Sequence, residues 1–212
     1  TPSSVDFSKT GSTVTIEVSS HASGRKAVLD WSSLDIAASE TLDFASSGAI
    51  YLNKSAGDGS AAVIAGTITG HSLATVVFID PDGVSLTGTV DSIRNLLVST
   101  IDLGITSATD AALVADPDTY SIDPAGTSTV SIGGSSAYTL GNKLRVVSGG
   151  AITIGGDITA DGGIKISSND GALDSTTNRI STTGTLTIST GSGNIDIDTS
   201  AGTADVTSTG SI

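Results

Sequence analysis

Apolar and polar residues alternate in short stretches along the whole chain. From about residue 128 onward a unit recurs in which a glycine and a spacer precede two apolar residues separated by one polar residue. The unit occurs at Gly150–Ile154, Gly162–Ile166, Gly184–Ile188 and Gly193–Ile197. Alternation over three to five residues predicts short β-strands with one buried face and one exposed face.

The glycines of these units are regularly spaced. Gly150, Gly171 and Gly193 are 21 and 22 residues apart, and Gly162 and Gly184 are 22 apart. Two interleaved series with one period of about 20 residues, and several very short strands per turn, are typical of a solenoid. We therefore predict an all-β fold, a parallel β-helix of about 20–22 residues per coil, with Ile, Leu and Val inside and Thr, Ser, Asp and Lys at alternate positions in solvent. The general handedness of parallel crossovers predicts a right-handed coil.

Composition supports this fold and narrows the classes of partner. Twenty-six glycines, three phenylalanines and many β-branched residues disfavour helices. A net charge of -13, from 9 basic and 22 acidic residues, argues against nucleic acids and anionic membranes as partners. No apolar run approaches the ~20 residues that span a bilayer, so we expect a soluble chain without membrane insertion. The absence of cysteine excludes disulfides and thiolate metal sites.

The first hundred or so residues are expected to cover one end of the solenoid, because an unpaired sheet edge invites aggregation. Val14–Val18 alternates cleanly and could pair across that end. The sole tryptophan, Trp31, lies in the alternating stretch Val28–Ile36, which predicts a core anchor where the cap meets the first coils. A ligand-stacking role is the alternative. The start at Thr1 without a methionine suggests that an N-terminal segment has been removed.

Residues 78–84, FIDPDGV, place two carboxylates between two apolar stretches. Asp80, Pro81, Asp82 and Gly83 match a type I turn, since Asp80 can bond to the turn amides and Pro81 fixes φ near -65°. A calcium loop of the EF-hand type needs ligands spread over twelve residues, and two neighbouring turn aspartates do not by themselves make a catalytic pair. We predict a turn, with no catalytic residue, metal or cofactor.

Other candidates for chemistry are weaker. His21 and His71 are far apart in sequence and lie near no Ser-Asp arrangement, so both are interpreted as solvated or turn histidines. Gly191–Asp196 is only superficially similar to a repeat-in-toxin calcium motif, because its aspartate spacing differs and no tandem nonapeptides follow. Residues 107–128 break the alternation and predict an irregular excursion between cap and repeats.

The first ~115 residues resemble the secretion domain of two-partner secretion exoproteins, the filamentous-haemagglutinin-like family of adhesins, cytolysins and contact-dependent inhibition toxins. Six blocks match in order, and together they run through half of the chain. The blocks are Ala27–Ile36, Glu40–Phe44, Ala49–Lys54, Val63–Ile68, Val77–Val84 and Leu97–Asp102. The resemblance implies a right-handed parallel β-helix with an N-terminal cap, in agreement with the repeat.

The resemblance also bears on individual residues. The family motif at residues 80–83 is normally Asn-Pro-Asn-Gly, and here both asparagines are aspartate. Since aspartate accepts the same backbone bonds, the turn geometry should survive, whereas any role of the side-chain amides in secretion is put in doubt. We assign Asp80, Pro81, Asp82 and Gly83 to a transporter-recognition or turn motif. Trp31 and Asn53 are assigned to the structural core.

These features predict a single domain over 1–212. Its parts are a cap at about 1–35, family-like first coils at about 36–115, an irregular segment at about 116–128 and regular coils at about 129–212. The resemblance implies a secretion-targeting domain of a large exported, adhesin-like protein of Gram-negative bacteria, in which it serves virulence. The resemblance also implies that the product is secreted or held at the cell surface. Its expected partner is an outer-membrane β-barrel transporter with periplasmic transport-associated domains.

Two other functions remain open at this point. A carbohydrate-active β-helix enzyme would need acidic or basic residues stacked on one face over successive coils, where the repeats offer mainly Thr and Ser. A glycan-binding adhesin surface could lie within this fragment, or host and matrix glycans could bind to a downstream region. We expect a monomer and no enzyme activity.

Overall fold

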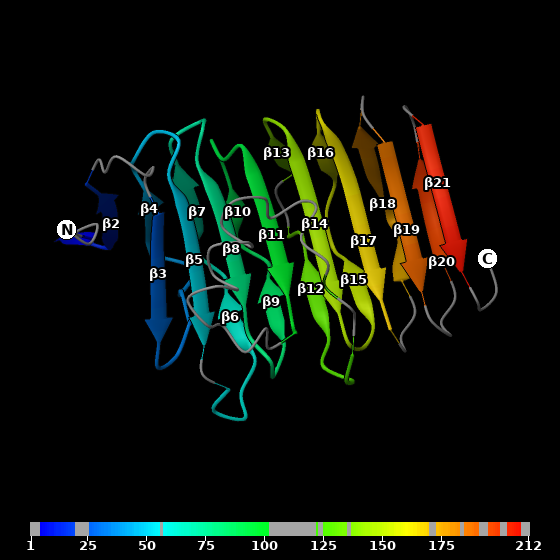
Figure 1. The fold of residues 1–212 in the computed structure, drawn as a ribbon, viewed down its shortest axis with the longest axis horizontal. Coiled ribbons are helices and arrows are strands. Elements are labelled where there is room, and N and C mark those ends of the chain that lie inside the picture. The colour runs from blue at the N-terminus through cyan, green and yellow to red at the C-terminus, as the bar shows by residue number, and fades with distance from the viewer. Residues whose placement is uncertain are drawn as a thin grey trace.

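The chain winds into a parallel β-helix whose coils follow one another along the longest axis of the molecule (Figure 1). The computed structural model describes residues 5–19, 26–55, 57–101, 122, 125–134, 137–169, 173–182, 185–190, 195–199 and 203–208. Every regular element in these ranges is a strand, and none of them contains a helix that could cross a membrane. The predicted all-β parallel β-helix is confirmed.

One face of the helix is an eight-stranded sheet, here sheet B, in which each pair of neighbours is parallel. From the N-terminal end its strands are β3 (Lys26–Trp31), β5 (Ile50–Ser55), β8 (Thr75–Ile79), β11 (Asn95–Ser99), β14 (Lys143–Ser148), β17 (Gly163–Ser168), β19 (Thr185–Thr190) and β21 (Thr203–Ser208).

The other faces are sheets C and A. Sheet C contains β6 (Ala62–Ile64), β9 (Val84–Leu86), β12 (Val130–Ile132), β15 (Ile152–Ile154), β18 (Leu173–Thr182) and β20 (Ile195–Thr199). It also contains β16 (Ile158–Ala160), which pairs with the second half of β18, and β13 (Tyr138–Leu140), which pairs with β16. Sheet A contains β1 (Val5–Thr10), β2 (Thr13–Val18), β4 (Thr41–Phe44), β7 (Thr67–Gly70) and β10 (Thr89–Val90).

The register of the strands agrees with the glycine spacing. In sheet C, Ile152 pairs with Leu173, which pairs in turn with Ile195. In sheet B, Ile164 pairs with Leu186. The two interleaved glycine series therefore mark two different faces of the same coils, and equivalent residues stack directly above one another.

Inward-facing side chains form one core that runs through the helix. Its largest members are aromatic: Tyr138 lies in β13, and the other three lie in the first coils. There the Phe44 ring is 4.7 Å from that of Tyr51 and 6.2 Å from that of Phe78, measured between centroids. Further along, β-branched and leucine side chains such as Val146, Ile166 and Ile188 stack at equivalent positions. Truncating one such residue to alanine costs about 2–5 kcal/mol.

The outer face of sheet B differs from the expected polar surface. Leu52, Val77, Leu97 and Val147 point outward at neighbouring positions, yet they are buried in a second apolar cluster with Ile122. The coil that contains Ile122 is longer than its neighbours, since Asn95 pairs with Thr75 on one side and with Lys143 on the other. The predicted irregular segment 116–128 falls in this coil, and its residues 116–121, 123 and 124 lie outside the described residues.

The N-terminal end is covered by an antiparallel hairpin of β1 and β2. Val14–Val18 lies in β2, which pairs in parallel with β4. β2 is therefore the first strand of sheet A that belongs to a coil. β3 is already a strand of sheet B, and the first coil therefore begins inside the region expected to be a cap, 1–35. The strand that closes the end is β1, whose Phe7 ring contacts Trp31 of β3.

Candidate functional site

The turn at residues 80–83 connects β8 of sheet B to β9 of sheet C. The Gly83 amide donates to the Asp80 carbonyl over 3.1 Å, and the Asp82 amide donates to Asp80 Oδ1 over 2.9 Å. Gly83 has a φ of 134°, a conformation that glycine alone adopts readily. The four residues thus form a hydrogen-bonded turn at a corner of the coil.

Asp80 is buried, with 1% of its surface exposed. Burial raises the pKa of its carboxyl above the ordinary value, and the charges of Asp82 and Asp58 act in the same direction. Hydrogen bonds from the Asp82 amide and the Ser55 side chain oppose the rise. A carboxyl group that faces the protein interior and is already bonded to main chain and hydroxyl groups has a structural role in the turn.

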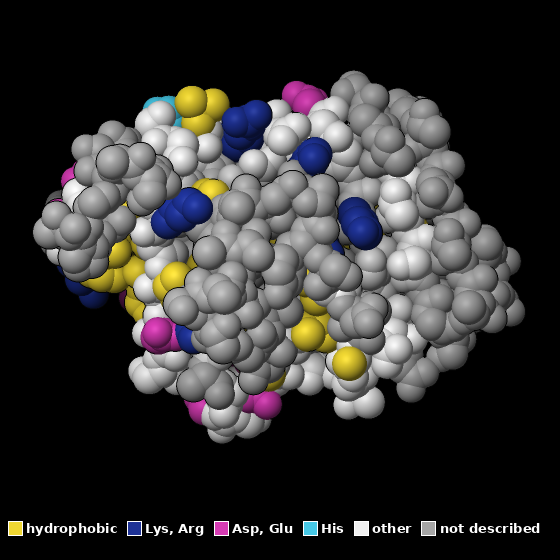
Figure 2. All heavy atoms as spheres, in the orientation of Figure 1, with side chains coloured by type: hydrophobic (Ala, Val, Ile, Leu, Met, Phe, Trp, Pro, Cys, Tyr) yellow, Lys and Arg dark blue, Asp and Glu magenta, His cyan; other side chains and the backbone are white. Residues whose placement is uncertain are grey.

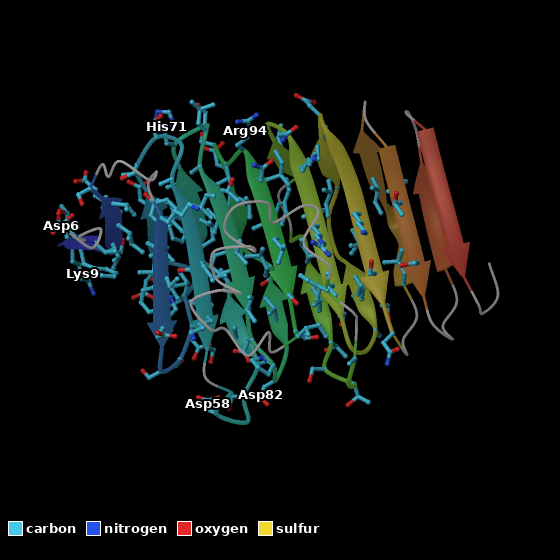
Figure 3. The ribbon with its side chains drawn as sticks, viewed as in Figure 1. Asp6, Lys9, Asp58, His71, Asp82 and Arg94 are labelled. Carbon is cyan, nitrogen blue, oxygen red and sulfur yellow. The ribbon has the colours of Figure 1, made fainter. Side chains whose placement is uncertain are left out.

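Asp82 joins this turn to the preceding coil. Its Oδ2 accepts a hydrogen bond of 2.7 Å from the amide of Gly59, in the loop that leads into β6. Within that loop Asp58 Oδ1 accepts from the Ser60 amide over 2.9 Å. Figure 3 shows Asp58 and Asp82 next to one another at the same end of the coils. The turn therefore fastens two successive corners together.

The space around these carboxylates is small. A cavity of about 10 Å³ lies between Asp80, Ser55, Asp58 and Asp35. That volume leaves room for about one water molecule. Among the residues that the structure describes, no group of three or more His, Cys, Asp or Glu side chains is arranged to hold a metal ion.

Asp80 also belongs to a column of buried polar residues that the sequence alone did not indicate. The column follows the ends of the sheet B strands and consists of Ser55, Asp80, Thr100, Ser148 and Ser168. The Ser148 hydroxyl donates to the Ser128 carbonyl over 2.8 Å, and the Ser168 hydroxyl donates to that of Gly150 over 2.7 Å. These two side chains thus add hydrogen bonds to main-chain carbonyls at the corner, where the chain leaves the strand.

Asn53 and Trp31 form a second polar contact, at the junction of cap and coils. Asn53 is fully buried, and its Oδ1 accepts a 3.1 Å hydrogen bond from Trp31 Nε1. Its Nδ2 donates to the Val77 carbonyl over 3.2 Å. A single side chain therefore connects β3, β5 and β8.

Trp31 lies at the rim of the core, not in its interior. The side chain is half-buried and packs against the core. Its ring contacts that of Phe7 edge to face, with the ring centroids 6.3 Å apart. Its position follows from that of β3, because β3 is the first strand of sheet B among the residues that the structure describes. The sequence placed this residue at the right junction but could not show that one side of it is open.

His71 lies in the turn between β7 and β8, as expected, and its Nδ1 accepts a 3.2 Å hydrogen bond from the Leu73 amide. It borders a cleft of about 430 Å³ with Asp6 and Glu17, which face each other across the β1–β2 hairpin. His21 and Gly191–Asn194 lie outside the described residues.

Comparisons with known proteins add one similarity. No protein-family model and no curated protein matches the chain. The crystal structure of the HMW1 secretion domain from Haemophilus influenzae is similar, with 14% sequence identity over 97% of this chain and 71% of that chain, and a TM-score of 0.48.

Proposed function

We propose that this chain is the secretion-targeting domain of a larger exported protein and that it is not an enzyme. The proposal rests on where the six blocks of family resemblance lie in the fold. In order, they overlap β3, β4, β5, β6 with the start of β7, the end of β8 with its turn and the start of β9, and the end of β11. The blocks thus recur in each of the first coils, and one of them includes the hydrogen-bonded corner at Asp80–Gly83.

The expected partner is an outer-membrane β-barrel transporter with periplasmic domains, and the expected destination is the cell surface or the medium. Folding coil by coil outside the cell would bias export forward, because each stacked coil removes chain that could slide back. The structure offers a template for such growth. Within the described residues β21 is the last strand of sheet B, and its outer edge presents unpaired main-chain groups to a following coil.

The geometry of the carboxylates favours this role over the enzyme alternative. Asp80 is buried in the turn and accepts a hydrogen bond from the Asp82 amide, and Asp82 accepts one from the Gly59 amide. Both carboxylates are therefore bonded to main-chain groups. The neighbouring cavity is far smaller than the ~300–1,000 Å³ of ordinary ligand sites. Adhesion and toxicity are assigned, in this proposal, to sequence downstream of the domain.

The test is export that depends on the transporter. The chain would be expressed, with a periplasmic signal, in a Gram-negative host with and without the outer-membrane transporter gene that neighbours its own, and the amount in the medium would be measured. We expect release only with the transporter, and no release of a control in which residues 27–102 are replaced by a β-helix segment lacking the six blocks. Equal release with and without the transporter would overturn the proposal.

A further inference from the structure

β3 has an open edge. It is the first strand of sheet B, and within the described residues nothing pairs with it on the side opposite β5. A groove of about 280 Å³ follows this edge, and Val28, Leu29, Asp30 and Trp31 line it from β3, whereas Val5 and Phe7 line it from β1. The groove therefore lies between the free edge of β3 and the strand that closes the end of the helix.

The side chains at this edge are unusually apolar for a surface. Phe7 is 55% exposed and Val28 is 39% exposed, and both line the groove. Figure 2 shows hydrophobic side chains on the surface at the N-terminal end, close to basic and acidic ones. An exposed, apolar strand edge is a site at which another strand can add.

The free main-chain groups of β3 can be assigned. The Thr75 amide donates to the Ala49 carbonyl over 2.9 Å, so Thr75 directs its main-chain groups toward β5 and its partner Ile50 directs its own toward β3. The direction alternates along each strand and between paired residues of a parallel sheet. Lys26, which pairs with Ile50, therefore directs its groups to the free edge, as do Val28 and Asp30.

We propose that two copies of this chain associate head to head through this edge, with β3 pairing antiparallel to β3 of the second copy about Val28. In this register Val28 lies opposite Val28, and Lys26 lies opposite Asp30 in both directions. Within the part of the chain that the structure describes, no strand pairs with the main-chain groups that these residues direct to the edge, so each of the three pairs can exchange two hydrogen bonds. The stretch Lys26–Asp30 is thus complementary to itself, as a two-fold interface requires.

The charges continue a ladder that already exists in one copy. Lys54 Nζ lies 2.9 Å from Asp30 Oδ1 on the outer face, and the Asp30 side chain remains 71% exposed. Pairing would place Lys26 of the second copy on the open side of Asp30, which gives the order Lys54, Asp30, Lys26 across the interface. Opposite charges at directly opposed positions stabilise antiparallel pairs, and like charges there destabilise them.

The inner side of the interface is apolar. Ala27 and Leu29 are buried members of the core, and antiparallel pairing about Val28 sets Ala27 of each copy opposite Leu29 of the other. The N-terminal end of the second copy would then cover the exposed part of the Phe7 side chain. This dimer departs from the monomer expected from the sequence, because the self-complementary pattern of β3 matters only when the strand is known to have a free edge. It does not depend on the secretion proposal.

The test exploits the symmetry of the charge pattern. Lys26→Asp and Asp30→Lys would be made separately in the 212-residue chain, and the dissociation constant of the dimer would be measured by sedimentation equilibrium. Each variant alone places like charges opposite one another twice, whereas an equimolar mixture restores two opposite pairs. Lys165→Asp and Asp91→Lys make the same charge changes at exposed sites away from the edge and are the controls. Circular dichroism of each variant checks its fold.

We expect a concentration-dependent dimer of the unchanged chain and of both controls. We expect a dissociation constant at least ~10-fold higher for each edge variant alone, and recovery in the mixture as a mixed dimer. A chain that stays monomeric at millimolar concentration would overturn the inference. A dimer that the edge variants leave unchanged, or a mixture that does not recover, would overturn it as well.

Discussion

Replacement of Gly83 by alanine or valine should destabilise the fold through two separate effects. The first is conformational, because a side chain at a φ of 134° occupies a region that non-glycine residues avoid, at a cost of about 1–3 kcal/mol. The second is steric. A Cβ at Gly83 would lie 3.0 Å from the Ala61 Cβ and 3.2 Å from the Thr129 carbonyl oxygen.

These two neighbours belong to the coils before and after the turn. Ala61 precedes β6 and Thr129 precedes β12, both in sheet C on either side of β9. Neither can retreat without shifting its own coil, so overpacking adds about 1–3 kcal/mol for the larger side chain. We expect Gly83→Ala to lower the free energy of unfolding by about 2 kcal/mol and Gly83→Val by about 3–5 kcal/mol.

The measurement is urea unfolding followed by far-ultraviolet circular dichroism. Gly59→Ala is the matched control, because Gly59 also has a positive φ, 87°, but a Cβ there meets no atom within 4 Å. We expect the control to cost about 1 kcal/mol, because a side chain at Gly59 meets the conformational cost of a positive φ without the steric one. Asp82→Asn, which keeps an acceptor for the Gly59 amide, should cost less than Gly83→Val. Equal losses for Gly83→Ala and Gly59→Ala would refute the steric part of the reasoning, and no loss for Gly83→Val would refute both parts.

Three further predictions concern the buried polar groups and the cap. Asn53→Leu should lower the free energy of unfolding by about 2–4 kcal/mol, because it removes the acceptor of Trp31 Nε1 and the donor to the Val77 carbonyl. A loss below about 1 kcal/mol in urea unfolding would contradict this prediction. Trp31→Ala should lower the free energy of unfolding by about 2–3 kcal/mol, less than the usual loss for a fully buried tryptophan, because the ring is half-buried. In the unchanged chain, iodide should quench part of the tryptophan fluorescence. Complete protection from iodide would instead place the ring in the interior. The raised pKa of Asp80 means that folding disfavours its carboxylate, so this group's contribution is most favourable below about pH 3.8 and is lost as the pH rises through the folded pKa. Asp80→Asn should therefore gain stability relative to the unchanged chain between pH 4 and pH 7, whereas a relative loss over that interval would show that the charged form is the stabilising one.

The path of the chain was readable from the sequence because each coil repeats a local pattern. Alternation of period two defines the short strands, and the spacing of Gly150, Gly171 and Gly193 sets the coil length, which the pairing of Ile152, Leu173 and Ile195 reproduces. The turn at Asp80–Gly83 was readable for the same reason, since its hydrogen bonds join residues two and three positions apart. The sequence did not indicate that the turn contacts Gly59 or lies close to Ala61 and Thr129, because the stacking of coils brings these residues to the turn.

The tertiary structure decided which positions are covered, and by what. Leu52, Val77 and Leu97 occupy outward positions of their strands, yet they are buried in one apolar cluster that also contains Ile122, a residue from a longer coil. Trp31 has the pattern of a core residue, but it lies at the rim because β3 is the first strand of its sheet. An alternating pattern fixes the direction in which a side chain points. Burial depends on which distant segment lies over that side chain, and only the folded chain determines that.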